Sequence, residues 1–248
     1  MRFISFDLET LRLIPEDSTN EDWKENFPLG ISCAGLASDD EVKIWRAKSG
    51  LSKIQAGRLV RYMAGKVEDG YTLVTWNGAS FDFFVLAECS GLYDQCAELA
   101  LNHVDLMVMV TFTKGWRLSL QTVCKGAGLA GKVKEVTLQD GTTIDNMDGE
   151  MAVGLWAKGD YEPVLTYLAG DVEQTLALAN KIYRDKIMKW KSQSGNAQMM
   201  TVPKMLLVKD CFDIPEPDTD WMDDPPVRYK FISWMSAEVI DRFMGLPF

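Results

Sequence analysis

Short β-prone runs alternate with segments of helical spacing along this chain. Residues 2–9, RFISFDLE, are mostly apolar and predict a buried strand with acids near its carboxyl end. Residues 11–30 are polar and contain two prolines, which is typical of a long loop. Residues 31–37 and 41–47 are β-prone runs separated by Ser-Asp-Asp, so they predict a hairpin. Three antiparallel strands are therefore expected at the start of the fold.

Strand and helix patterns continue beyond this hairpin. Apolar residues keep helical spacing over residues 51–66, and residues 71–76, YTLVTW, predict another buried strand. The strongest helical pattern covers residues 161–190, although Gly170 costs about 1 kcal/mol relative to alanine inside a helix. Further elements are expected at residues 81–90 (helix), 103–108 (short strand) and 119–128 (helix). The alternation predicts an α/β fold with a mixed central sheet flanked by helices.

The C-terminal part of the chain has a different composition. Residues 192–198, SQSGNAQ, break the helical pattern and predict a linker. Residues 209–226 contain seven acids, one lysine and four prolines, which is typical of an extended loop. We therefore expect one domain over residues 1–191 and an acidic, proline-rich extension over residues 192–248. The acids of this extension fit a cover for a substrate groove or a contact with a protein partner.

Composition argues against several classes of protein. The chain is 47% hydrophobic and 25% charged, as expected for a globular protein. Its five cysteines include no CxxC pair and it has one histidine, so neither a disulfide framework nor a Cys/His zinc site is expected. Apolar stretches are too short for a signal peptide or a membrane span, which favours a cytoplasmic protein. A net charge of −10 argues against a broad basic face for duplex nucleic acid, although bound cations can supply local positive charge.

Two acids share one face of the first predicted strand. Asp7 and Glu9 are two residues apart, so their carboxylates point to the same side of the sheet. Carboxylates at the end of an apolar strand are costly unless water or a cation solvates them. A pair of metal ligands and a solvated strand end are both open interpretations of this pattern.

Two further acids stand in distinctive local contexts. Asp82 follows an Asn-Gly turn and lies between two phenylalanines, where it fits either a ligand or an acid at a helix start. Asp171 lies four residues after Tyr167, so both side chains share one face of the long helix. Taken alone, that pair fits a simple surface hydrogen bond. Asp105 is interpreted as a turn cap rather than a residue that orients a ligand, and His103 as structural.

The order and contexts of these motifs resemble the DEDDy branch of the DnaQ-like exonucleases. FDLET resembles the first motif of that family, NGASFD the second, and YLAGD the third, which has the form Y-x-x-x-D. The ribonuclease H-like fold of this family is shared by the proofreading domains of family B DNA polymerases and by ribonuclease D. Thr166 stands where the DEDDh branch has a histidine, so the tyrosine branch is the one that fits.

This resemblance implies a metal-dependent 3'-to-5' exonuclease with two divalent cations, Mg²⁺ or Mn²⁺. Asp7 would bridge both cations, Glu9 and Asp171 would complete the site on the nucleophile side, and Asp82 would act on the leaving-group side. Tyr167 would hydrogen-bond the attacking water. Oxygen ligands suit these cations, and the product would be a nucleoside 5'-monophosphate.

The resemblance also indicates a substrate and its contacts. We expect single-stranded nucleic acid, with DNA favoured over RNA. Residues near the motifs are candidate contacts with the terminal nucleotide, although they fit the core equally well: Thr10, Leu11, Asn77 and Phe81. Four basic residues are candidate phosphate contacts, with ordinary solvated side chains as the favoured alternative: Lys114, Arg117, Lys132 and Lys134.

Two alternative functions are compatible with this sequence. One is a catalytically idle module on the same fold that binds nucleic acid or a protein partner. The presence of all four acids and the tyrosine argues against that alternative. The other is a phosphodiesterase specific for short oligonucleotides, which would use the same acids on a smaller substrate.

Overall fold

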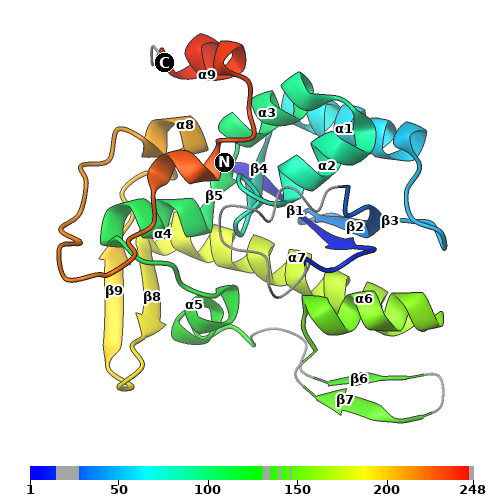
Figure 1. The fold of residues 1–248 in the computed structure, drawn as a ribbon. Helices are drawn as coiled ribbons and strands as arrows, with labels where there is room; N and C mark the ends of the chain where they lie inside the picture. Colours follow the sequence, from blue (N-terminus) through cyan, green and yellow to red (C-terminus); the bar gives the residue numbers. More distant parts are fainter. Residues whose placement is uncertain (15–27, 131–134, 139–140, 146, 246–248) are drawn as a thin grey trace.

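A five-stranded mixed sheet forms the centre of the fold (Figure 1). The computed structural model describes residues 1–14, 28–130, 135–138, 141–145 and 147–245. The sheet has the order β3-β2-β1-β4-β5, with the bounds β1 Arg2–Thr10, β2 Ile31–Ala37, β3 Val42–Arg46, β4 Tyr71–Thr75 and β5 Val104–Asp105. β1 pairs antiparallel with β2 and parallel with β4, so it is the strand at which the sheet changes direction. The predicted α/β fold with a mixed sheet is confirmed.

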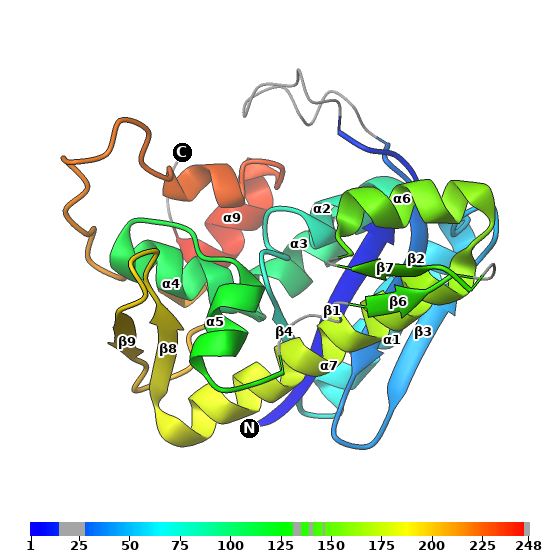
Figure 2. The same ribbon diagram turned by 90° about the horizontal axis from the view of Figure 1, so that it is seen from below.

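Helices cover both faces of this sheet. α1 Lys53–Glu68, α2 Asp82–Ser90 and α3 Tyr93–Leu101 lie on one side, and α7 Tyr161–Asp185 crosses the other side along β1 and β2 (Figures 1 and 2). Every residue of β2 is buried, as expected for a strand covered on both faces. α1 begins at a capping box, in which Ser52 and Gln55 each accept a hydrogen bond from the other's backbone N–H.

Close contacts set the position of α7 on the sheet. The Ser5 hydroxyl on β1 donates a hydrogen bond of 2.6 Å to the carbonyl of Val172 in α7. A Cβ atom on Gly35 of β2 would lie 3.1 Å from Leu168 and 3.2 Å from Val172, so the glycine lets the helix approach closely. The middle of α7 is therefore held directly against the strand that carries Asp7.

The second half of the chain adds helices and two hairpins around this centre. Their bounds are α4 Leu106–Lys114, α5 Leu120–Gly126, β6 Glu135–Thr137, β7 Thr143–Asp145, α6 Gly149–Lys158, β8 Ile187–Lys191, β9 Ala197–Thr201, α8 Val208–Cys211, η2 Arg228–Phe231 and α9 Ala237–Met244. β8 packs on α5 so tightly that a Cβ atom on Gly126 would lie 2.3 Å from the Cα atom of Trp190. Within the described residues, no helix combines the length and apolar character that crossing a membrane requires.

Two predicted elements end earlier than the sequence pattern indicates. The strand predicted at residues 103–108 is wrong beyond Asp105, because the Asp105 carboxylate accepts two backbone N–H groups and starts α4 there. The long helix ends at Asp185, because Lys186 adopts a positive φ of 58° that stops the helical path.

The linker predicted at residues 192–198 is also wrong. These residues form the turn of the β8–β9 hairpin and the start of β9, and the Ser192 N–H donates to the Asn196 carbonyl at 2.9 Å. A polar turn and a polar linker have the same composition, so only the pairing of the flanking strands separates them. The loop predicted at residues 209–226 is confirmed apart from the short α8 at its start. Most of the loop predicted at residues 11–30 lies outside the described residues.

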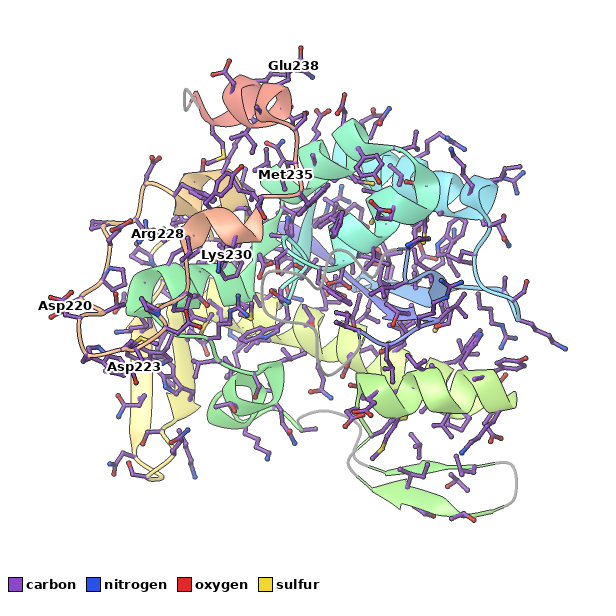
Figure 3. All side chains as sticks on the ribbon, viewed as in Figure 1. Asp220, Asp223, Arg228, Lys230, Met235 and Glu238 are labelled. Carbon is purple, nitrogen blue, oxygen red and sulfur yellow. The ribbon has the colours of Figure 1, made fainter. Side chains whose placement is uncertain are left out.

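The C-terminal segment, residues 202–245, packs against α3 and α4 (Figure 3). The Trp234 indole N–H donates to the carbonyl of Ala79 at 2.8 Å, and its ring stacks on Phe84 with the ring centroids 5.6 Å apart. Phe231 of the same segment is fully buried. The segment therefore contributes to the core, and the expected division of the chain at residue 191 stays a prediction.

Arg228 fastens the loop that precedes η2. Its guanidinium donates to the carbonyls of Phe112 and Pro215, each at 3.0 Å, and to the carbonyl of Ile214. It also lies 4.9 Å from the centroid of the Phe112 ring, within the range of a cation–π contact. One side chain thus links α4 to two positions of the C-terminal loop.

We expect Arg228→Ala to lower the free energy of unfolding by about 2–3 kcal/mol. The substitution removes several hydrogen bonds from a charged donor and leaves part-buried carbonyls without that donor. Urea unfolding followed by tryptophan fluorescence measures the change. Arg242→Ala, which removes an exposed arginine of α9, is the control and should change stability by less than about 0.5 kcal/mol. Equal stability of the two variants would contradict the role of Arg228.

Candidate active site

β1 carries Asp7 and Glu9 on the face that α7 covers. Ser5 lies on this face and is bonded to α7, and side chains two and four residues later point to the same side. Glu9 is 7% exposed, and its Oε2 atom lies 3.8 Å from the position that a Cβ atom would take on Gly149, the first residue of α6. The positive end of the α6 dipole therefore favours the Glu9 carboxylate.

A tight turn between β4 and α2 places Asp82 at the start of α2. Asn77 has a φ of 72°, in the left-handed region that asparagine tolerates better than most residues. The backbone N–H groups of Asn77 and Ala79 donate to the two carboxylate oxygens of Asp105, each at 3.0 Å. Asp105 therefore caps this turn, as the sequence indicated, and it also caps α4, which the sequence did not indicate.

A buried histidine supports the same turn. Thr75 Oγ1 accepts the Gly78 N–H at 3.1 Å and lies 2.8 Å from His103 Nε2. His103 Nδ1 lies 2.6 Å from the carbonyl of Ala100, which can only accept, so Nδ1 carries the proton and Nε2 accepts from Thr75. Burial lowers the pKa of His103, which keeps the ring neutral. A Cβ atom on Gly78 would lie 2.5 Å from Thr75 Oγ1, so the turn requires glycine.

Asp82 is buried and touches both β1 and Asp7. Its Oδ1 atom accepts the backbone N–H of Leu8 at 3.1 Å, and its side chain is hydrogen-bonded to that of Asp7. Burial raises the pKa of Asp82 well above its usual value, and the charge of Asp7 raises it further. Two carboxyl groups in such contact share a proton more readily than they carry two negative charges.

α7 presents Tyr167, Asp171 and Thr175 on one face. Successive members of this set are four residues apart, which is close to one helical turn. All three side chains are buried. The hydrogen bond from Ser5 to Val172 holds this part of the helix beside the strand that carries Asp7.

Asp7 and Asp171 line one cavity of about 520 Å³. Asn77 from the turn also lines it, together with Arg117 and Ser119 from the connection between α4 and α5. The volume is within the usual range for small-ligand pockets. Carboxylates that can bind cations and a guanidinium that can bind a phosphate therefore meet in one cavity.

Two predicted contact residues lie elsewhere at the end of β1. The Thr10 hydroxyl donates to the carbonyl of Arg12 at 2.9 Å. The side chain of Leu11 fills the space beside Gly50, where an added Cβ atom would lie 2.2 Å from Leu11 Cδ1. Neither Thr10 nor Leu11 is among the described residues that line the cavity of Asp7.

Phe81 belongs to a neighbouring cavity of about 410 Å³. It shares that cavity with Asn77 and with Asp224 and Lys230 of the C-terminal segment. The candidate phosphate contacts Lys132 and Lys134 lie outside the described residues.

The donor set suits a hard divalent cation. Asp7, Glu9, Asp82 and Asp171 offer only carboxylate oxygens, which Mg²⁺ and Mn²⁺ prefer. Among the residues that the structure describes, no three His, Cys, Asp or Glu side chains lie close enough together to hold one metal ion. Asp7 and Asp82 are nevertheless in contact, and Mg²⁺ keeps several waters, so few carboxylates suffice. The residues therefore fit a cation that is bound partly through water.

Sequence patterns did not identify every residue of the cavity. Thr175 continues the four-residue spacing of Tyr167 and Asp171, and helical periodicity is the signal that points to it. Ser119 caps α5 by accepting the Thr122 N–H. A helix-start signal in the sequence predicts this cap, but it does not predict that Ser119 lines the cavity. Trp76 directly follows β4 and also lines the cavity, but its sequence context is the same as that of an ordinary core residue.

Comparison with known proteins identifies the family. Among solved structures, a family B DNA polymerase from the hyperthermophilic archaeon Pyrobaculum calidifontis is 19% identical, with a TM-score of 0.49, over 73% of this chain and 24% of the polymerase chain. This chain thus spans about a quarter of that polymerase's length. No curated protein sequence matches it. The family model described as RNase H superfamily matches residues 6–183, which include all four acids and Tyr167. The expected ribonuclease H-like fold is therefore confirmed, and the chain belongs to the RNase H superfamily.

Proposed function

We propose that this chain is a 3'-to-5' exonuclease that hydrolyses the terminal phosphodiester of single-stranded nucleic acid, with DNA preferred to RNA. The observation that carries the proposal is the cavity lined by Asp7 and Asp171, with Asp82 in contact with Asp7. Membership of the RNase H superfamily supports phosphodiester hydrolysis as the reaction class. The direction of attack comes from the resemblance of the three motifs to those of the DEDDy exonucleases.

Four carboxylates would hold two divalent cations, Mg²⁺ or Mn²⁺, partly through bound water. Asp7 would bind both cations, and Asp82 would serve the side of the leaving oxygen. Glu9 and Asp171 would complete the site on the side of the attacking water, at least one of them through a water molecule. When bound, such cations stabilise the attacking and leaving oxygens of an in-line displacement. In their absence, burial and Asp7 favour protonation of Asp82, so cation binding should release a proton and strengthen as pH rises.

Tyr167 and Arg117 would position the reacting groups. The Tyr167 phenol is buried one helical turn from Asp171, and a phenol can donate and accept hydrogen bonds to orient a water. Arg117 lines the cavity of Asp7 and would contact the phosphate that is attacked. Water attacks phosphorus, the bond to the O3' atom of the preceding nucleotide breaks, and a nucleoside 5'-monophosphate leaves.

A 5'-labelled strand tests the proposed activity directly. Single-stranded DNA, RNA and duplex DNA are incubated with the full chain in Mg²⁺, Mn²⁺ or EDTA. We expect a ladder that shortens from the 3' end of the single strands, and no products in EDTA. Cleavage of a closed circular single strand at a comparable rate would show an endonuclease instead.

We expect Asp7→Asn to lower turnover by more than about 100-fold while the protein stays folded. The substitution removes the carboxylate that would bind both cations, and such a loss exceeds the roughly 10–100-fold effect of changing residues that only support ligands. Melting temperature reports the fold, and the rate of nucleotide release reports turnover. Asp94→Asn, which neutralises an exposed acid of α3, is the matched control. Retention of more than about a tenth of the wild-type rate by Asp7→Asn would contradict its role.

Tyr167→Phe should lower kcat by about 10–1000-fold with little change in KM. Only the hydroxyl is lost, while the ring still fills its buried position, and positioning groups typically contribute factors of this size. Steady-state kinetics in Mg²⁺ and Mn²⁺ measure both constants. Tyr161→Phe on the same helix is the control and should leave them unchanged. A rise in KM alone would assign Tyr167 to substrate binding rather than to the attacking water.

Asp82→Asn should flatten the dependence of stability on pH when EDTA is present. Because the folded-state pKa of Asp82 is raised, folded Asp82 keeps a proton that the unfolded chain releases. Wild-type stability therefore falls as pH rises from the usual carboxyl range toward the raised pKa, and the asparagine variant lacks this fall. Urea unfolding from pH 4 to 8 measures it, with Asp94→Asn as control. Identical pH profiles of wild type and Asp82→Asn would show that Asp82 is ionised in the metal-free fold.

A further inference from the structure

A second, larger cavity adjoins the candidate active site. It has a volume of about 1020 Å³ and lies between the α4–α5 connection, the β8–β9 hairpin and Trp221 of the C-terminal loop. The described residues that line it include Arg117 and Lys191 but no acid. The chain as a whole has 36 acids against 26 basic residues, so a lining of this size without an acid departs from its general composition.

The second cavity shares part of its lining with the cavity of Asp7 and Asp171. Arg117 and Ser119 line both cavities, so a strand that leaves the carboxylates on this side passes the Arg117 guanidinium. This guanidinium lies 5.1 Å from the centroid of the Phe231 ring in the C-terminal segment. We call this second cavity the side channel.

Aromatic side chains form much of the wall of the side channel. Trp221 is 67% exposed, and its ring lies 6.0 Å from that of Trp116 in an edge-to-face arrangement. Trp116 is half-buried, whereas Trp190 is buried in the wall, where β8 packs on Gly126 of α5. Exposed tryptophan is costly in water, and a large indole face beside cationic groups is suited to stacking on an unpaired base.

We propose that the side channel binds the unpaired nucleotides that precede the 3'-terminal nucleotide of a single-stranded nucleic acid. Trp221 and Trp116 stack on bases, and Lys191 contacts a phosphate of these nucleotides. Arg117 lines both cavities and keeps its contact with the phosphate that is attacked. This inference rests on the proposed function for the direction of the strand, but binding itself does not require hydrolysis. More than half of the described residues that line the channel, those of the β8–β9 hairpin and Trp221, lie beyond residues 6–183, which the family model matches.

The charges of the C-terminal loop are consistent with this assignment. Figure 3 shows Asp220 at the outer edge of the loop and Asp223 further along it, whereas Arg228 and Lys230 are drawn near α4. Both acids are exposed, and neither is among the described residues that line the channel. Asp224 of the same loop lines the neighbouring cavity of Phe81, together with Arg117 and Lys230, and it too is not among the described residues that line the channel.

Binding of a fluorescein-labelled twelve-nucleotide single strand of thymidines, measured by anisotropy in EDTA, tests the stacking residue. We expect Trp221→Ala to weaken binding by roughly 5- to 150-fold, the range that corresponds to the stacking of one base on an aromatic side chain. Trp221→Phe should restore most of the affinity because it retains an aromatic face. Ile54→Ala on α1 is the control, because Ile54 is also 67% exposed and apolar. Unchanged affinity of Trp221→Ala would overturn the proposal.

The salt dependence of binding tests the phosphate contacts. Arg117→Gln and Lys191→Gln should each reduce the slope of log affinity against log salt concentration by about 0.7, the value for one contact with a single strand. Arg58→Gln, which changes an exposed arginine of α1, should leave the slope as in the wild type. An unchanged slope in both channel variants, or tighter binding of a duplex than of a single strand, would overturn the proposal.

Hydrolysis of strands of different length separates this inference from the proposed function. Wild-type KM should fall as the strand lengthens from two to about ten nucleotides, and Trp221→Ala should lose much of this fall. Hydrolysis with the same length dependence in both proteins would overturn the side channel and leave the exonuclease intact. Strand binding that depends on Trp221 without hydrolysis in Mg²⁺ or Mn²⁺ would support the channel and reject the exonuclease.

Discussion

The carboxyl groups of Asp7 and Asp82 are in contact inside the protein. The surrounding structure must hold them together against the repulsion between two negative charges. Like charges so close in a buried setting are unfavourable, so the contact persists because the backbone on both sides is fixed. The Leu8 N–H binds Asp82, and Asp105 holds the turn that precedes it. The contact between these two carboxyl groups lowers stability until a proton or a cation neutralises one of the charges, and packing elsewhere in the fold offsets this loss. Reactive sites commonly contain such unfavourable contacts between charged groups.

The turn before Asp82 is held by parts of the chain that are far apart in sequence. Thr75 and His103 bind it from β4 and from the residue before β5, and Trp234 of the C-terminal segment donates to the Ala79 carbonyl. Trp234 lies beyond the stretch that the family model matches. The C-terminal segment can therefore influence the position of Asp82 indirectly, because Trp234 donates a hydrogen bond to a backbone carbonyl of the turn that precedes Asp82.

The sequence predicted the elements whose signal is local. Apolar runs located the strands of the central sheet but not β6 to β9, and the Asn-Gly pair located the turn that Asn77 forms with positive φ. Residues 187–190 predict the end of a helix and residues 192–198 a linker, whereas they form much of the β8–β9 hairpin, because the pairing of β8 with β9 leaves no local signal in polar residues. The candidate acids were visible as motifs, whereas the contact of Asp82 with Leu8 and the cavity around Arg117 depend on contacts distant in sequence. Periodicity and composition carry no information about such contacts.

The acidic composition of the chain bears on whether it would bind single-stranded or duplex nucleic acid. With a net charge of −10, most of the surface repels a polyanion, and attraction is confined to places where cationic groups gather. Duplex nucleic acid needs a broad basic face and keeps its bases paired. It would therefore gain little from two basic side chains and exposed indole rings. At the proposed side channel, an unpaired strand would gain stacking energy at Trp221 in addition to contacts with Arg117 and Lys191. If the proposed side channel binds nucleic acid, the acids that argue against duplex binding would also favour unpaired ends, because they weaken every mode of binding in which the tryptophans take no part.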